Sequence, residues 1–124
     1  MTPSEPQRAV VLFAHGSRDP LWHKPMEAVA AHMAMGDPDL RVRCAYLELS
    51  QPDLPTVCLE LVEARTTRIV VVPMFLGVGR HAREDLPVLV EQLRAQHPQV
   101  VFELKPAVGE DVRLVQLLAR IAAE

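Results

Sequence analysis

The chain has 124 residues, about the size of one domain, and 49% of them are hydrophobic, so it can bury a substantial core. Its formal charge of −3 argues against non-specific nucleic-acid binding, which usually needs a basic surface. No apolar run approaches the roughly 18–20 residues that cross a membrane, and the opening MTPSEPQR lacks a secretory-signal pattern. We expect one domain over residues 1–124, located in the cytoplasm.

The first half of the chain alternates apolar runs with segments of helical period. Residues 9–14 are wholly apolar, which is typical of a strand buried on both faces. Apolar side chains then recur at helical spacing and predict a helix that ends near Gly36. Residues 42–49 predict a second strand, and a helix is expected to start at Ser50, with Pro52 in its first turn.

The second half repeats this alternation. Residues 69–76 form a strongly apolar predicted strand that ends at glycines, and a third helix follows and ends before Pro98. Residues 100–104 predict a shorter strand, and Asp111 is placed to cap a C-terminal helix. The apolar face of that last helix is expected to comprise Leu114, Val115, Leu118 and Ile121.

Strands that alternate with helices of this length predict a four-stranded parallel sheet with helices on both faces. The first and third runs are nearly all apolar and should be central, whereas the second and fourth carry polar residues and should lie at the edges. Right-handed crossovers then favour the order 2-1-3-4. We predict a single α/β domain with a three-layer, flavodoxin-like architecture.

The two cysteines, Cys44 and Cys58, form neither a CxxC pair nor a disulfide framework. Each stands among apolar residues. Buried free thiols in a reducing compartment are the preferred interpretation.

Candidate chemical groups follow three neighbouring strands of the predicted sheet. His15 directly follows the first strand, Glu48 lies at the end of the second, and His81 follows the third. Ligands of open parallel sheets bind at this edge, where the winding direction reverses. Imidazole and carboxylate suit a borderline divalent ion, and histidine can accept protons near neutral pH. His15, His81 and Glu48 are therefore candidate metal ligands, and the two histidines are candidate proton acceptors.

Arginines on the same segments offer a second kind of contact. Arg18, Arg80 and Arg83, with Ser17 beside them, could hold substrate carboxylates. A cationic rim on an acidic chain favours a small polyanionic substrate. Each of these residues, taken alone, is as typical of an ordinary loop or surface as of a functional site. A site is favoured because all of them are expected at the same edge of the sheet. The remaining histidines, His23, His32 and His97, are assigned structural roles.

Four segments carry a family resemblance: VVLFAHGSRDP, YLELSQPDLP, VVPMFLGVGRHAREDLP and PAVGED. Together they resemble the short, single-domain sirohydrochlorin chelatases among the class II tetrapyrrole chelatases. The resemblance implies that the family's two metal- and proton-handling histidines are His15 and His81, and that its carboxylate ligand is Glu48. Arg80 departs from the pattern, because such sequences often have a glycine there. The resemblance also implies a homodimer.

The implied reaction inserts Co²⁺ or Fe²⁺, with Ni²⁺ as the third alternative, into sirohydrochlorin with release of two protons, as in cobalamin or sirohaem biosynthesis. No phosphate-binding loop is present, so neither ATP nor a cofactor beyond the substrate metal is expected. Two alternatives stay open: a non-catalytic carrier of a metal or tetrapyrrole, and a histidine-dependent phosphoryl-transfer enzyme. The latter chemistry typically has an arginine directly before the histidine, where this chain has Ala14. The physiological metal, the exact tetrapyrrole and the identity of the proton-accepting histidine remain open.

Overall fold

The structure is a computed structural model that describes residues 7–124. Residues 1–6 lie outside the described part of the chain. They belong to the predicted 1–124 domain and include most of the opening segment MTPSEPQR, in which no secretory-signal pattern was found. The strands are β1 (Arg8–Ala14), β2 (Arg41–Tyr46), β3 (Arg68–Pro73) and β4 (Val101–Leu104). The helices are α1 (Lys24–Gly36), α2 (Leu54–Glu63), α3 (Arg80–Gln96) and α4 (Val112–Ala123). No helix within residues 7–124 is long and apolar enough to span a membrane.

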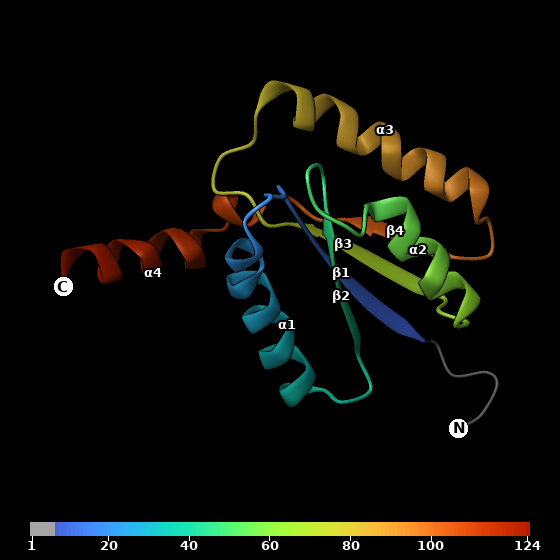
Figure 1. Ribbon diagram of the computed structural model, residues 1–124, viewed down its shortest axis with the longest axis horizontal. Coiled ribbons are helices and arrows are strands. Elements are labelled where there is room, and N and C mark those ends of the chain that lie inside the picture. The colour runs from blue at the N-terminus through green and yellow to red at the C-terminus, as the bar shows by residue number, and fades with distance from the viewer. Residues whose placement is uncertain (1–6) are drawn as a thin grey trace.

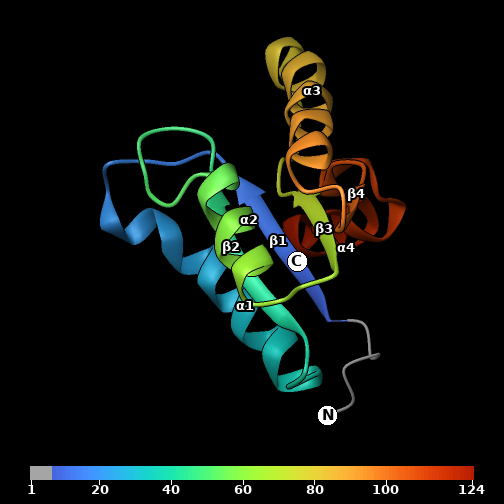
Figure 2. The ribbon, with the colours of Figure 1, turned by 90° about the vertical axis from the view of Figure 1, so that its right-hand side faces the viewer.

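The four strands form one parallel sheet in the order β2-β1-β3-β4, which confirms the predicted fold class and strand order (Figure 1). α2 and α3 lie on one face of the sheet and α1 lies on the other (Figure 2). The polar second and fourth strands are at the edges because an edge strand tolerates solvent contact. The two apolar strands, β1 and β3, pair directly at the centre.

Successive side chains of the central strands point to opposite faces and build two cores. Val11 and Val71 pack with α2 and α3, whereas Val10, Leu12 and Met26 form the smaller core beneath α1. Residues 9–14 of β1 are all apolar because both faces of the strand are covered there, and only its first residue, Arg8, is exposed.

Leu61→Ala is expected to lower the free energy of unfolding by about 3 kcal/mol, because it leaves a cavity between α2 and the sheet. Leu61 is 1% exposed and belongs to the larger core. Leu59→Ala, on the same helix at a 48% exposed side chain, is the matched control and should change stability by less than about 0.5 kcal/mol. Urea unfolding of the two variants checks the difference, and equal losses would contradict the assigned core.

The boundaries around the second predicted strand and helix were wrong. β2 ends at Tyr46 and not at residue 49, and α2 begins at Leu54 and not at Ser50. Asp53 is the N-cap residue, since its side chain accepts a hydrogen bond from the Thr56 backbone N–H at 2.9 Å. Ser50 makes long-range contacts instead of capping the helix. Similarly, β3 ends at Pro73 rather than at residue 76.

α4 has the predicted cap but not the predicted packing. Asp111 accepts a hydrogen bond from the Arg113 backbone N–H at 2.8 Å. The helix has no buried residue, and Figure 1 shows it extending away from the sheet. The apolar spacing correctly predicted a helix, but none of its residues is buried against the part of the chain that the structure describes.

Both cysteines are free, and Cys58 is fully buried while Cys44 is half-buried. Burial raises the pKa of the Cys58 thiol to about 12, so it stays protonated at pH 8. We expect iodoacetamide at pH 8 to leave Cys58 unmodified in the folded protein and to modify it after denaturation. Peptide mass spectrometry checks this, and fast labelling in the folded state would contradict the assigned burial.

Candidate functional site

His15 and Glu48 meet at the carboxyl edge of the sheet. They lie just beyond the paired ends of β1 and β2, where Ala14 is opposite Tyr46. Nδ1 of His15 is 3.2 Å from one carboxylate oxygen of Glu48 and 3.4 Å from the other. Both side chains are about half exposed, at 52% and 42%, so the pair is accessible to a substrate.

Gly16 allows the loops after β1 and β2 to lie this close together. A Cβ atom at this buried position would be 1.8 Å from the Glu48 backbone oxygen and 2.9 Å from the Ser50 Cβ. A side chain there would push the Glu48 backbone away. The glycine after His15 is thus required by a close approach of two backbones.

Ser50 ties the same two loops together. Its hydroxyl donates to the Ser17 carbonyl at 2.7 Å and accepts from the Ser17 backbone N–H at 2.9 Å. Nε2 of His23 also lies 3.0 Å from this oxygen. Since the single Ser50 proton is used on Ser17, His23 donates from Nε2. The His23 ring stacks on Tyr46, with centroids 4.5 Å apart.

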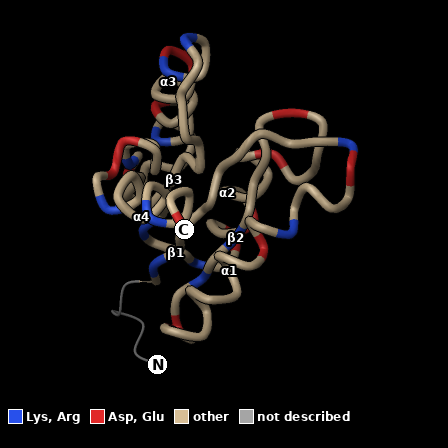
Figure 3. The backbone as a smooth tube through the Cα atoms, turned by 90° about the vertical axis from the view of Figure 1, so that its left-hand side faces the viewer, with Lys and Arg blue, Asp and Glu red and all other residues tan. Residues whose placement is uncertain are grey.

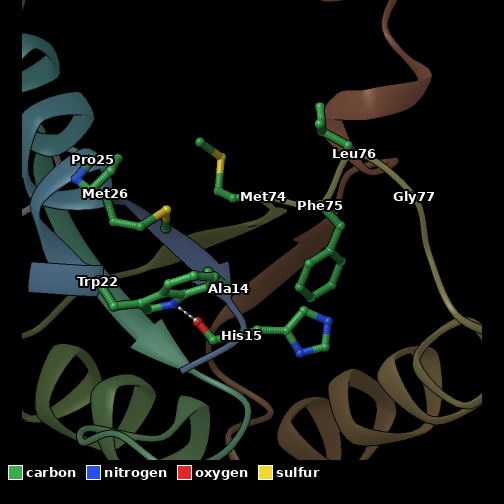
Figure 4. Close-up of a pocket in the computed structure, with 9 residues that line it drawn as sticks. All are labelled: Ala14, His15, Trp22, Pro25, Met26, Met74, Phe75, Leu76 and Gly77. Atoms are coloured by element: carbon green, nitrogen blue, oxygen red, sulfur yellow. Dashed lines mark hydrogen bonds between the residues drawn. The ribbon is translucent and has the colours of Figure 1, made fainter. Parts of the chain in front are cut away.

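An apolar pocket of about 300 Å³ adjoins His15 (Figure 4). Trp22 forms part of its wall and donates its indole N–H to the His15 carbonyl at 2.8 Å. The rings of His15 and Phe75 are 4.8 Å apart. The pocket is lined by Ala14, His15, Trp22, Pro25, Met26, Met74, Phe75, Leu76 and Gly77. One imidazole therefore stands beside an otherwise apolar surface at the predicted edge.

Three further candidate residues lie in the first turn of α3, which we expected to be a loop. Arg80, His81 and Arg83 are all exposed there. The helix starts at Arg80 because Gly79, at its N-cap, has extended backbone angles. Residues 7–124 contain no group of three histidine, cysteine or acidic side chains able to hold a metal ion. The structure thus brings His15 and Glu48 together and leaves His81 apart from them.

The expected cationic rim carries both signs of charge in the structure. Nε of Arg80 is 3.2 Å from a Glu84 carboxylate oxygen, and Figure 3 shows acidic and basic residues side by side at the start of α3. Arg83 lines a separate hollow beneath α3. Arg18 is exposed on the loop after β1, and Ser17 is half-buried beside Ser50. The sequence could not show these pairings, which depend on side-chain conformation.

Sequence reasoning missed Trp22, Ser50 and Phe75 as parts of the site. Phe75 could have been found, because it lies two residues beyond the end of β3, a central strand that ends at the same edge. Ser50 was interpreted as a helix cap, and its true contacts are 33 residues away in sequence. Trp22 lies in the 3-10 turn η1 (Pro20–His23), directly ahead of α1.

Ser50→Ala is expected to lower stability by about 2 kcal/mol, because it removes the hydrogen bonds that join the two site loops. Thr67→Ala is the matched control. Like Ser50 with Ser17, its hydroxyl accepts from the N–H and donates to the carbonyl of one residue, Gln7, at 2.9 and 3.2 Å, but at the opposite end of β3. Both variants should be destabilised in thermal unfolding, and only Ser50→Ala should also weaken ligand binding at His15. Equal effects on binding would contradict a positioning role.

The family model named CbiX matches residues 9–124. A sirohydrochlorin cobaltochelatase of Methanopyrus kandleri is 38% identical over 80 residues, which cover 64% of this chain and 55% of that protein. Another, of Sulfolobus acidocaldarius, is 27% identical over 109 residues, or 88% of this chain and 85% of that protein. The chain spans less than two thirds of several such relatives, including 57% of the Methanothermobacter thermautotrophicus protein.

Solved structures share the fold. A CbiX protein from Marinobacter aquaeolei superposes with a TM-score of 0.80 and 31% identity, covering 94% of both chains. SirB from Bacillus subtilis subspecies spizizenii, a sirohydrochlorin chelatase solved with cobalt, gives a TM-score of 0.71 at 23% identity. That match covers 92% of this chain and 49% of the SirB chain, and it supports the fold alone.

Proposed function

Because this chain belongs to the CbiX family, we propose that it inserts a divalent metal ion into sirohydrochlorin and releases two protons. Relatives are named sirohydrochlorin cobaltochelatase and sirohydrochlorin ferrochelatase, so Co²⁺ and Fe²⁺ are the metals proposed first and Ni²⁺ the third. The observation that carries the proposal is the contact between His15 and Glu48 at the rim of an apolar pocket.

His15 is proposed to bind the incoming metal and then to accept a pyrrole proton. With its Nδ1–H donated to Glu48, the Nε2 lone pair is free for either task. The carboxylate keeps the ring in this tautomer and stabilises the imidazolium after proton uptake, as carboxylates do beside other catalytic histidines. One Glu48 carboxylate oxygen accepts the His15 Nδ1–H, and the other can bind the metal. Glu48 can therefore act as a metal ligand together with His15 and His81.

The apolar pocket is proposed to receive one face of the macrocycle. Trp22, Met26, Met74 and Phe75 offer flat or flexible apolar surface to a conjugated ring. Burying the ring face against them supplies binding energy without fixing the metal, so the ring nitrogens can replace water and protein ligands at the ion.

His81 is proposed as the third metal and proton group, reaching the ion when the ring is bound. The first buried residue of α3 is Leu86, so the turn that carries His81 can shift without loss of core packing. Arg18, Arg80 and Arg83, with Ser17, are proposed to hold the eight carboxylates of the ring and to fix its orientation. Arg80 would exchange Glu84 for a substrate carboxylate.

We further propose that two copies act together, because a single four-stranded sheet edge covers only one side of such a ring. The proposed reaction needs neither ATP nor a further cofactor. A cytoplasmic location is proposed from the two free thiols, which suit a reducing compartment.

An anaerobic absorbance time course tests the proposal. Sirohydrochlorin is mixed with trace protein and, in separate cuvettes, Co²⁺, Fe²⁺ or Ni²⁺, with a protein-free control for each metal. Many turnovers per protein copy are expected. A bound spectrum without turnover would replace the proposal with a carrier. Hydrolysis of a phosphate ester without any tetrapyrrole reaction would instead favour phosphoryl transfer.

A further inference from the structure

His23 makes two contacts that the proposed reaction does not use. It is the last residue of η1, a 3-10 turn with no buried residue. Its ring stacks on Tyr46 with centroids 4.5 Å apart and an interplanar angle of 29°. Its Nε2 lies 3.0 Å from the hydroxyl oxygen of Ser50, which is 27 residues away in sequence. The stack fixes the plane of the imidazole, and in that plane the Nε2–H is directed at Ser50.

Ser50 joins this contact to the site. Its oxygen accepts from the Ser17 N–H at 2.9 Å, and its proton is donated to the Ser17 carbonyl at 2.7 Å. Its own backbone N–H donates to the Glu48 carbonyl at 2.8 Å. A hydroxyl has one proton and two acceptor positions, so the N–H groups of Ser17 and His23 use both acceptor positions. Ser50 is thereby held in one rotation between the segments that carry His15 and Glu48.

The residue before His23 holds the same segment at another point. Trp22 donates its indole N–H to the His15 carbonyl at 2.8 Å (Figure 4). Asp19 caps η1 by accepting from the Leu21 N–H at 2.9 Å. The segment that carries His15 is therefore bound to η1 directly through Trp22 and indirectly through His23. Since η1 buries no residue, these polar contacts set its position against the site.

The geometry assigns His23 a positioning role and excludes a proton relay. The chain of donors runs from His23 through the Ser50 hydroxyl and ends at the Ser17 carbonyl, which accepts a hydrogen bond but has no proton to pass on. The pocket beside His15 is lined by Trp22 but not by His23. His23 can therefore affect the reaction only by fixing where the neighbouring groups lie.

We propose that His23 is a positioning residue of the metal-inserting site, because its hydrogen bond to Ser50 holds the segment of His15 against Glu48. The contact that it protects is the 3.2 Å distance between Nδ1 of His15 and the Glu48 carboxylate. That distance is already long for a hydrogen bond, so a displacement of about 1 Å would break it. The inference rests on the function proposed above and adds to that site a residue to which the sequence assigned a structural role.

His23→Phe tests the donated hydrogen bond, because phenylalanine keeps a ring that can stack on Tyr46 but has no N–H. The kcat for metal insertion is expected to fall by about 10-fold, less than the roughly 10²-fold that a full 1 Å displacement costs. The KM for sirohydrochlorin should change by less than about 2-fold, because the pocket wall is intact. His32→Phe, at an exposed position of α1, is the matched control and should keep both constants. An unchanged kcat in His23→Phe would overturn the proposal.

His23→Gln separates the hydrogen bond from the stacked ring. The side-chain nitrogen of glutamine lies as many bonds from Cβ as Nε2 of histidine, so it can donate to Ser50 without an aromatic ring. The kcat of this variant is expected to stay within about 2-fold of that of the unchanged chain, because the net value of one hydrogen bond is retained. Equal losses in His23→Gln and His23→Phe would show that the ring matters and the donated proton does not, which would overturn the proposal.

A double-mutant cycle tests whether His23 acts through Ser50. Ser50→Ala alone should lower kcat at least as far as His23→Phe, because it also releases Ser17. When both changes are combined, His23→Phe should add less than about 2-fold, since its partner is already absent. Losses that multiply in the double variant would show that His23 acts by another route and would contradict the assigned role.

The position of His15 can also be measured without turnover. A hydrogen-bond partner at one ring nitrogen selects the tautomer of a neutral histidine, so the contact with Glu48 keeps the proton on Nδ1. Nitrogen-15 NMR at about pH 9, well above the ordinary pKa of histidine, reports which nitrogen carries it. The unchanged chain and His23→Gln should show the proton on Nδ1, and His23→Phe should show a larger share on Nε2.

The NMR result separates this inference from the proposed function. The same tautomer in all three chains would overturn the positioning role of His23, whatever the rates are. The expected shift in a protein that inserts no metal would leave the positioning of His15 standing and overturn the proposed function alone.

Discussion

His15→Ala is expected to lower the rate of metal insertion by about 10²–10⁴-fold, the usual contribution of a positioned proton acceptor. The loss follows from geometry, because His15 is the imidazole at the pocket and the group that Glu48 contacts at 3.2 Å. The measurement is the absorbance time course with sirohydrochlorin and Co²⁺. Since the side chain is half exposed, the melting temperature should change little, so the loss reports on chemistry.

His32→Ala provides the matched control, because His32 is exposed on α1 and lines none of the site described above. It should retain the full rate. If His15→Ala kept most of the rate while binding the metal and the ring, the proposed mechanism would be wrong, and His81 would become the main candidate for the proton acceptor.

The fold could be predicted because its determinants are local in sequence. After their first residues, Arg8 and Arg68, β1 and β3 are entirely apolar, which predicts strands covered on both faces. The right-handedness of crossovers then leaves few possible strand orders. Boundaries were predicted less well where a residue had two possible roles. Ser50 fits a helix cap by sequence, but in the structure it joins two loops while Asp53 caps α2.

The site could be predicted in part for a similar reason. His15 and Glu48 follow neighbouring parallel strands, so the sheet alone brings them to one edge. His81 lies in the first turn of a helix, and sequence does not specify in which direction that turn projects. For α4, the sequence predicted a helix with an apolar face. The direction in which the helix leaves the sheet (Figure 1) depends on the 3-10 turn η2 (Val108–Glu110), whose Gly109 lies against the Leu76 backbone.

Gly16→Ala is expected to damage stability and activity together. The new Cβ atom would lie 1.8 Å from the Glu48 backbone oxygen, and backbone cannot rotate aside as a side chain can. We expect a loss of about 3 kcal/mol in the free energy of unfolding, at the upper end for overpacked sites. Separating the two loops also moves His15 relative to Glu48, and a displacement of about 1 Å can cost on the order of 10²-fold in rate.

Gly36→Ala is the control, because it replaces a glycine by alanine without creating a steric clash. A Cβ atom on Gly36 would have nothing within 4 Å, and the residue ends α1 away from the pocket. Its substitution should leave turnover unchanged and alter the unfolding free energy by less than about 1 kcal/mol.

Gly109→Ala is the second control, because its new Cβ atom would also lie 1.8 Å from a backbone oxygen, but in the 3-10 turn η2 (Val108–Glu110). It should lower the unfolding free energy as much as Gly16→Ala does. If Gly16→Ala had the same unfolding free energy and the same rate of metal insertion as Gly36→Ala, the loops after β1 and β2 would not be in close contact. The proposed alignment of His15 by Glu48 would then lose its structural basis.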